Sequence, residues 1–218
     1  MSQSPNDLFA VRLQKLERLR ARGIDPYPRQ YDRTHTSQEA ACLFESSEEK
    51  GNADFRTDEV SVAGRLVAFR GMGNATFADL LDGFGRVQVL FRRNLLPDTY
   101  EVLKDLDLGD WLGAKGPLFR SRSGEVTLEV REFTVLCKAL RPLPEKWHGL
   151  TDIEIRFRQR YLDLIANEES RRIAVMRSRI ISSIRRNMDG RGFIEVETPI
   201  LVPVPAGAMA HPFVTHHN

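Results

Sequence analysis

Residues 59–91 read EVSVAGRLVAFRGMGNATFADLLDGFGRVQVLF, and this stretch decides the fold of the 218-residue chain. It contains three runs, 60–69, 75–81 and 86–91, in which apolar residues alternate with other residues. Such alternation is typical of a strand with one buried face. Glycine-rich turns separate the runs, and Asp82-Gly83 is a strong hairpin signal. The stretch therefore predicts three consecutive strands joined by short turns.

Two further strands are predicted on the C-terminal side, at 111–119 and 125–137. Between the third and fourth strands, residues 95–106 have the apolar spacing of a helix. Three strands, a helix and two strands is the order of the five-stranded Greek-key barrel known as the OB-fold. We therefore predict an α+β, mostly β, fold built on this barrel.

The alternation also sorts the strand residues by face. An outward aromatic ring such as Phe77, near the amide of Gln88 and the carboxylate of Glu125, suits an unpaired base. The ring stacks on the base, while the amide and the carboxylate bind base edges. Ordinary packing of Phe77 in the barrel is the alternative, and the pattern leaves both open. The residues predicted to point outward are Ala75, Phe77, Asp79, Arg86, Gln88, Glu125, Thr127 and Glu129.

Composition limits the function only loosely. The net charge is +2, from 32 basic and 30 acidic residues, so overall charge favours neither presence nor absence of a nucleic-acid partner. No run approaches the roughly 18 apolar residues of a membrane span. The first residues lack an apolar secretory core, which predicts a cytoplasmic protein. Cys42 and Cys137 lack metal-ligand spacing, and we expect reduced thiols.

Helices are predicted on both sides of the barrel. Residues 7–22 have an apolar stripe, and their basic residues either follow a phosphate backbone or form a solvated face. Residues 38–54 contain a second short helix, and a long helix follows Asn167, with a strand at 193–198. The predicted organisation is a helical arm at 1–56, the barrel at 57–138, a linker at 139–152, and the start of a second domain at 153–218. The basic residues of the first helix are Arg12, Lys15, Arg18 and Arg22.

A family resemblance enters at residues 191–199, RGFIEVETP, which resemble motif 1 of class II aminoacyl-tRNA synthetases. The segments RYLDL at 160–164 and PFVTHHN at 212–218 lie on either side of this motif. Together with GIDPYP at 23–28, they are similar to bacterial lysyl-tRNA synthetases. The resemblance covers nearly the whole chain.

The resemblance implies an anticodon-binding OB domain, followed by a catalytic domain built on an antiparallel sheet. It implies a ligase that attaches lysine to tRNA, with ATP and Mg²⁺ as cofactors, a lysine-anticodon tRNA as partner, and a homodimer. Gly207 and Ala208 would contribute to the amino-acid pocket. The implied anticodon-binding residues are Arg70, Phe77, Gln88 and Glu125. The implied dimer element is Arg191, Gly192, Phe193 and Pro199.

The sequence also departs from the family pattern. Phe69 and Asn74 stand where basic residues are usual, and Ala206 and His211 differ from the usual residues before Pro212-Phe213. Motifs 2 and 3, which bind ATP in the family, do not occur in these 218 residues. We therefore expect no catalytic residue and no metal site in this chain, and no activity from it alone. A free-standing OB-fold tRNA-binding protein and the matching part of an aspartyl- or asparaginyl-tRNA synthetase are the alternatives.

Overall fold

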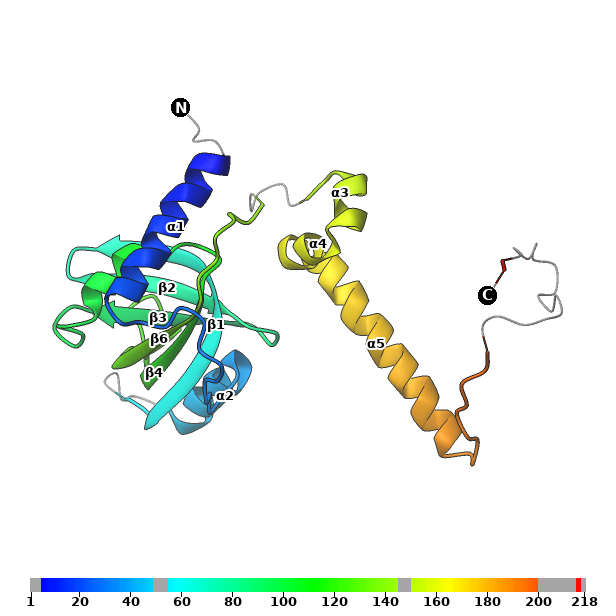
Figure 1. The fold of residues 1–218 in the computed structure, drawn as a ribbon. Coiled ribbons are helices and arrows are strands. Elements are labelled where there is room, and N and C mark those ends of the chain that lie inside the picture. Colours follow the sequence, from blue (N-terminus) through cyan, green and yellow to red (C-terminus); the bar gives the residue numbers. More distant parts are fainter. Residues whose placement is uncertain (1–4, 49–54, 145–149, 200–214, 217–218) are drawn as a thin grey trace. The chain divides into compact units, whose positions relative to one another are not determined.

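The computed structural model describes residues 5–48, 55–144, 150–199 and 215–216. The chain divides into two compact units, Met1–Pro144 and Glu145–Asn218, which we describe separately. The first unit contains all the strands of the described chain, and the second contains three helices in its described part (Figure 1).

The first unit is a closed barrel. Its hydrogen-bonded strand order is β1-β2-β3-β5-β4-β6, and an additional pairing of β1 with β4 closes a ring of five strands. All pairs are antiparallel except β3 with β5. This topology confirms the predicted OB-fold. The strands are β1 (Glu59–Met72), β2 (Ala75–Leu81), β3 (Arg86–Arg92), β4 (Trp111–Arg120), β5 (Val126–Glu129) and β6 (Glu132–Cys137).

Two predicted elements differ from the structure. The expected strand 125–137 is divided into β5 and β6, because the first part pairs with both β3 and β4 while the second pairs with the other end of β4. The expected helix at 95–106 is reduced to a 3-10 helix, η1 (Tyr100–Asp105). Pro97 accounts for the shortening, because proline disfavours helical backbone at the residue before it.

The core confirms the inward-facing residues of the strands. Ala78, Leu80, Val89, Phe91 and Leu128 each have 0% exposure, and they belong to one cluster with residues of the other strands and of both N-terminal helices. Burying a valine, leucine or phenylalanine side chain stabilises the fold by about 1.5–3 kcal/mol. The alternation in residues 59–91 therefore predicted the buried side of the barrel.

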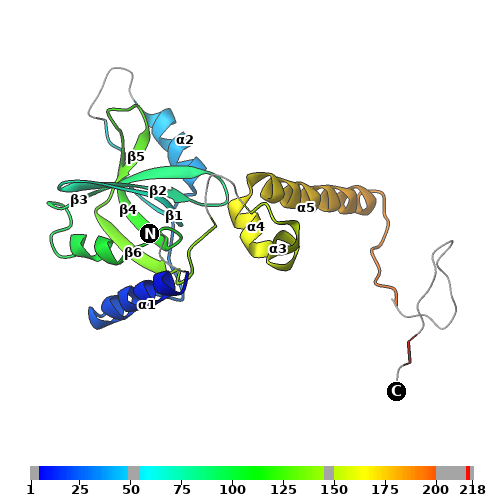
Figure 2. The same cartoon turned by 90° about the horizontal axis from the view of Figure 1, so that it is seen from above.

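Helix α2 (Ser37–Ser47) closes one end of the barrel. Thr36 and Glu39 form a reciprocal capping box at its start, and Phe44 is fully buried in the core. Asp82, in the turn after β2, accepts hydrogen bonds from the backbone N–H (2.8 Å) and hydroxyl (2.6 Å) of Ser37. Burial acts to raise the pKa of Asp82, but the hydrogen bonds from Ser37 and from the turn outweigh it and hold the pKa below its ordinary value. In both views the barrel lies between α1 and α2 (Figures 1 and 2).

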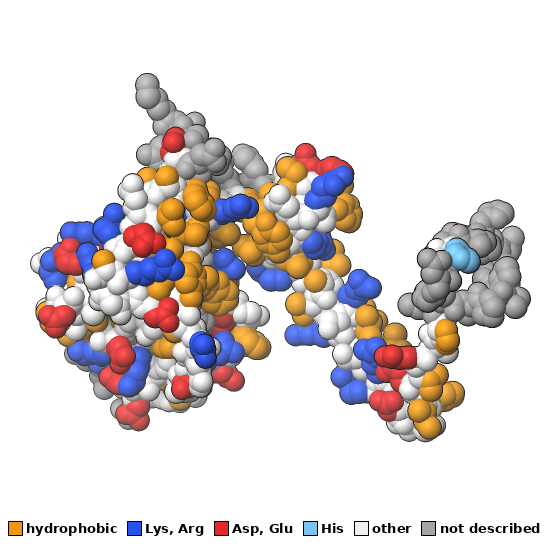
Figure 3. Space-filling model, viewed as in Figure 1, with side chains coloured by type: hydrophobic (Ala, Val, Ile, Leu, Met, Phe, Trp, Pro, Cys, Tyr) orange, Lys and Arg blue, Asp and Glu red, His pale blue; other side chains and the backbone are white. Residues whose placement is uncertain are grey.

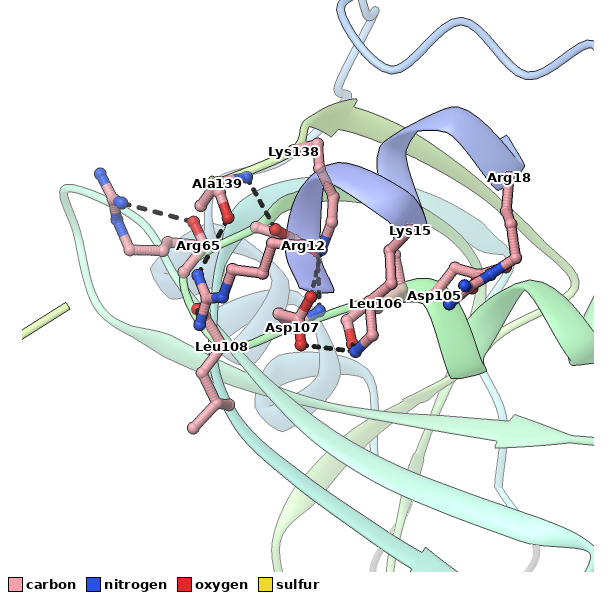
Figure 4. Close-up of polar contacts among 12 residues, drawn as sticks. Arg12, Lys15, Arg18, Arg65, Asp105, Leu106, Asp107, Leu108, Lys138 and Ala139 are labelled. Atoms are coloured by element: carbon pink, nitrogen blue, oxygen red, sulfur yellow. Dashed lines mark hydrogen bonds and ion pairs between the residues drawn. The ribbon is translucent and has the colours of Figure 1, made fainter. Parts of the chain in front are cut away.

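Helix α1 (Pro5–Ala21) uses its basic residues to bind the barrel, a role that neither predicted interpretation included. Figure 4 shows Arg12 and Lys15 pointing at the loop after η1 and at the end of β6, and Arg18 pointing at Asp105, the last residue of η1. Arg12 donates to the carbonyl oxygens of Ala139 (2.9 Å), Arg141 (3.2 Å) and Leu108 (3.3 Å). Leu16 and Leu19 are buried beneath the helix. The ion pairs of the same helix join Lys15 to Asp107 at 2.6 Å, and Arg18 and Arg22 to Asp105 at 2.7 and 3.6 Å.

A buried ionic cluster lies below α1. Lys138 has no exposed side-chain surface, and its ammonium group lies 2.5 Å from Asp107 and 2.8 Å from Asp110. Burial acts to raise the pKa of Asp107, but hydrogen bonds from Lys138 and Lys15 outweigh it and lower the pKa. This cluster fixes the point at which the chain leaves the barrel (Figure 4).

The second unit contains α3 (Ile153–Arg158), α4 (Arg160–Ala166) and α5 (Glu168–Asp189). Asp163 is fully buried and pairs with Arg156 at 2.7 Å and with Arg160, while Asn167 donates to it at 2.5 Å. Burial acts to raise the pKa of Asp163, but these hydrogen bonds outweigh it and lower the pKa. Asp163, in the RYLDL segment, thus connects the three helices.

Helix α5 begins directly after Asn167, as predicted, but the residues that follow the helix differ from their prediction. Gly192 has φ +82°, a left-handed conformation that favours glycine, at the turn after the helix. The predicted strand at 193–198 is wrong: these residues have no regular secondary structure. A strand needs a neighbour to satisfy its backbone N–H and C=O groups, and no described segment pairs with them. Gly207 and Ala208 lie outside the described residues.

Candidate nucleic-acid interface

One outer side of the barrel brings together the residues that the sequence singled out. Strand register places Arg70 opposite Phe77, and Gln88 opposite Thr127. Directly paired residues project to the same side of a sheet, so these side chains share one surface with Glu125, which precedes β5. We call the surface formed by Arg70, Phe77, Gln88, Glu125 and Thr127 the outer face. Phe77 is half-buried within it.

Hydrogen bonds fix the polar end of the outer face. The amide nitrogen of Gln88 donates to the Glu125 carboxylate at 2.5 Å, and the Thr127 hydroxyl donates to the Gln88 amide oxygen at 2.8 Å. Thr127 therefore determines which way the amide points. One N–H of Gln88 and one oxygen of the exposed Glu125 are not used in this pairing, and they can bind the donor and acceptor edge of a base.

The structure corrects the exposure of Asp79. It was expected to point into solvent, but its exposed fraction is 4%. The Arg70 and Arg86 guanidinium groups cover it, at 3.6 and 3.4 Å from its carboxylate oxygens. Two arginines on one carboxylate leave an excess positive charge beside Phe77. The Arg70 side chain is 58% exposed, so it can still contact a phosphate group.

Thr127 and Glu129 are the other corrections on this surface. Both were predicted to point outward, yet their exposed fractions are only 0% and 4%. Their direction is correct, because Thr127 pairs with Gln88 and Glu129 pairs with Leu90 in the β3–β5 register. Alternation predicts the direction of a side chain but not its neighbours: arginine side chains surround the Glu129 carboxylate, and the Thr127 hydroxyl donates to Gln88. The role of Thr127 in orienting Gln88 was missed for the same reason.

The structure positions two of the four departures from the family pattern, whereas Ala206 and His211 lie outside the described residues. Phe69 lies near the end of β1 with 36% exposure, and Asn74 lies in the exposed turn between β1 and β2. The adjacent Gly73 has φ +62°, which permits this tight turn. Both residues are therefore close in sequence to Arg70, and neither adds positive charge to that side of the outer face.

Comparison with known proteins identifies the two units. A family model described as an OB-fold nucleic acid binding domain matches residues 60–136. A model described as tRNA synthetases class II (D, K and N) matches residues 152–218. The chain is 49% identical to the lysine–tRNA ligase of Moorella thermoacetica over 217 residues, which is 99% of this chain. It is 48% identical over 99% of its length to that of Carboxydothermus hydrogenoformans, and 49% identical over 98% to that of Enterococcus faecalis.

The chain belongs to the lysine–tRNA ligase family. It corresponds to the N-terminal portion, with the OB-fold domain and the start of the class II domain, and it spans about 43% of the length of each of these relatives. The model for the class II domain is shared by the aspartate, lysine and asparagine enzymes, whereas all three relatives are named for lysine.

Lysine–tRNA ligases are class II enzymes, and the resemblance to them implies ATP and Mg²⁺. Within the described ranges, no group of three or more His, Cys, Asp or Glu side chains could hold a metal ion. The described residues therefore do not fit a magnesium site. The motif 1 residues Arg191, Gly192, Phe193 and Pro199 are all exposed.

No helix in the described residues is long and apolar enough to cross a membrane.

Exposed apolar side chains line α5. Figure 3 shows apolar side chains interspersed with basic ones along this helix. Ile180 is 53% exposed and Ile184 is 59% exposed, and Phe193 beyond the helix is 59% exposed. Apolar residues at this spacing on a solvent-facing helix are typical of an interface. The other exposed apolar side chains of α5 are Ile173, Val175, Met176, Ile181 and Met188.

Proposed function

We propose that this chain supplies tRNA recognition in a lysine–tRNA ligase, with the outer face binding the lysine anticodon. The observation that carries the proposal is the hydrogen-bonded set Gln88, Glu125 and Thr127 beside Phe77 on one surface. Phe77 would stack on a base, Gln88 and Glu125 would bind its edge, and Arg70 would contact a phosphate group.

The remaining roles rest on family membership. We propose that the whole enzyme joins lysine to tRNA in the cytoplasm, using ATP and Mg²⁺, and that it acts as a homodimer. Arg191, Gly192, Phe193 and Pro199 would form the dimer element together with the apolar side of α5. Gly207 and Ala208 would contribute to the amino-acid pocket. We further propose that 1–56 is a helical arm, 57–138 the anticodon-binding domain, 139–152 a linker, and 153–218 the start of the catalytic domain.

The proposed binding of a base edge by Glu125 can be tested directly. The wild-type chain should bind a stem-loop with the lysine anticodon more tightly than the same stem with a scrambled loop. Replacing Glu125 by alanine should reduce this preference by about 1.5–3 kcal/mol, the range for a hydrogen bond to a charged group. The affinity for the scrambled loop should not fall, because a carboxylate repels RNA wherever it does not accept a base hydrogen bond.

The control is Glu132→Ala, since Glu132 is an exposed carboxylate on β6, outside the outer face. It should leave the preference unchanged. Fluorescence titration at fixed salt concentration measures the affinity of each variant for the two stem-loops. Equal affinity of the wild-type chain for the two loops would refute the proposed function.

A further inference from the structure

Three arginines surround a single carboxylate at one side of the barrel. Arg131 lies 2.9 Å from the carboxylate of Glu129, Arg92 lies 3.2 Å from it, and Arg56 lies 3.3 Å from it. The Glu129 side chain is 6% exposed, whereas each arginine side chain is 42–43% exposed. We call Arg56, Arg92, Arg131 and Glu129 the arginine cluster.

Strand register places the arginine cluster on the same surface as Phe77. Phe77 pairs with Leu90 across β2 and β3, and Leu90 pairs with Glu129 across β3 and β5. Arg70 lies on the other side of Phe77, opposite it on β1. Neighbouring strands are about 4.8 Å apart, so the row from Phe77 to Glu129 covers roughly 10 Å. The aromatic residue therefore has exposed guanidinium groups on both sides.

A second aromatic ring accompanies the arginine cluster. Phe119 pairs with Thr127 across β4 and β5, which places it on this surface as well. The Arg56 guanidinium lies over the Phe119 ring, 4.9 Å from its centre. A stacked arginine and a flat ring are the groups that proteins use along single-stranded nucleic acid.

The arginine cluster carries more positive charge than is needed to neutralise Glu129. One guanidinium is enough to neutralise Glu129, and three leave a net charge of +2. Like charges repel, so gathering them is unfavourable unless an anion binds there. Because Glu129 is buried, it holds the guanidinium groups from below and leaves their outer edges open to solvent. Arginine binds phosphate oxygens with two parallel hydrogen bonds, which suits such an arrangement.

We propose that the arginine cluster binds backbone phosphates of single-stranded RNA next to the bases at Phe77, Gln88 and Glu125. This inference rests on the proposed function, since it extends the same RNA path across β3 and β5. It assigns Arg56, Arg92 and Arg131 an affinity role that is independent of base identity.

Single substitutions test it without unpairing Glu129. Arg92→Gln and Arg131→Gln each leave two arginines on the carboxylate, so both variants should fold, which thermal unfolding checks. Each should weaken binding of cognate and scrambled stem-loops by the same factor. Each should also lower the slope of log affinity against log salt concentration by about 0.7, the value for one phosphate contact on a single strand. Arg131→Lys retains the charge and should retain most of the slope.

Arg93→Gln is the matched control. Arg93 is next to Arg92 in sequence and 48% exposed, but it pairs with Glu101 at 2.8 Å and stacks on Tyr100. Its substitution should leave the salt slope unchanged. If Arg92→Gln and Arg131→Gln bind with the wild-type affinity and slope while Phe77→Ala still weakens binding, the inference is wrong and the proposed function stands. If the wild-type chain binds neither loop, both are wrong.

Discussion

Replacing Gly116 by alanine is expected to lower the free energy of unfolding by about 3 kcal/mol or more, the upper end for overpacking. A Cβ atom at Gly116 would lie 1.9 Å from the carbonyl oxygen of Glu129, 2.9 Å from its carbonyl carbon, and 3.2 Å from the Arg131 nitrogen. All three are backbone atoms, and the Arg131 N–H is itself bonded to the Lys115 carbonyl oxygen at 2.8 Å. The chain cannot move away without breaking the junction between β5 and β6.

Gly71→Ala is the control for this substitution. Gly71 also lies in a strand, but a Cβ atom there would meet nothing within 4 Å. Its loss of stability should be small. Urea denaturation of both variants measures the difference, and a Gly116 variant as stable as the Gly71 variant would show that the close approach is incorrectly described.

Replacing Asp110 by alanine is expected to cost about 3–5 kcal/mol, the range for removing one partner of a buried ion pair. Asp110 has 0% exposure and accepts hydrogen bonds from Lys138 (2.8 Å), from the Ala139 N–H (2.8 Å) and from the Asp107 N–H (2.7 Å). The substitution leaves the fully buried Lys138 with Asp107 alone and leaves two backbone donors unsatisfied.

The matched control for Asp110 is Asp98→Ala, because Asp98 is exposed in the loop before η1. Exposed substitutions usually change stability by less than about 0.5 kcal/mol. Thermal and urea unfolding of the two variants should therefore differ clearly. Equal stability would mean that the buried cluster below α1 contributes nothing to the fold.

Much of the barrel could be predicted because its signals are local. The alternation in β2 and β3, together with the Asp82-Gly83 turn, predicted the bounds of these strands to within one residue. The division of the last strand could not be predicted in this way, because it depends on where β5 meets β3, about forty residues away. Pro97 is a local signal for a shorter helix at η1, but the prediction followed the apolar spacing of residues 95–106.

The sequence predicted the direction in which the side chains of the candidate site point, but not the residues that surround them. The predicted outward direction of Gln88 and Glu125 is consistent with the hydrogen bond between them. The arginines that cover Asp79 and Glu129 come from separate segments of the chain, and only the strand register brings them together. The basic residues of α1 likewise bind carbonyl and carboxylate oxygens that follow them by about 90–130 positions in sequence. Side-chain contacts over such separations have no signature in a single sequence.

Phe77→Ala is the most direct test of the claim that the outer face binds a base by stacking. The account predicts that the variant loses about 1–3 kcal/mol of binding free energy for the lysine anticodon stem-loop, the range for one base–aromatic stack. Because Phe77 is half-buried, its loss of stability should remain below the roughly 3–5 kcal/mol that a core phenylalanine costs. Phe9→Ala, a change on α1 with 37% exposure, should alter neither quantity appreciably. A Phe77 variant that unfolds like a core variant, yet binds the stem-loop with wild-type affinity per folded molecule, would contradict the account.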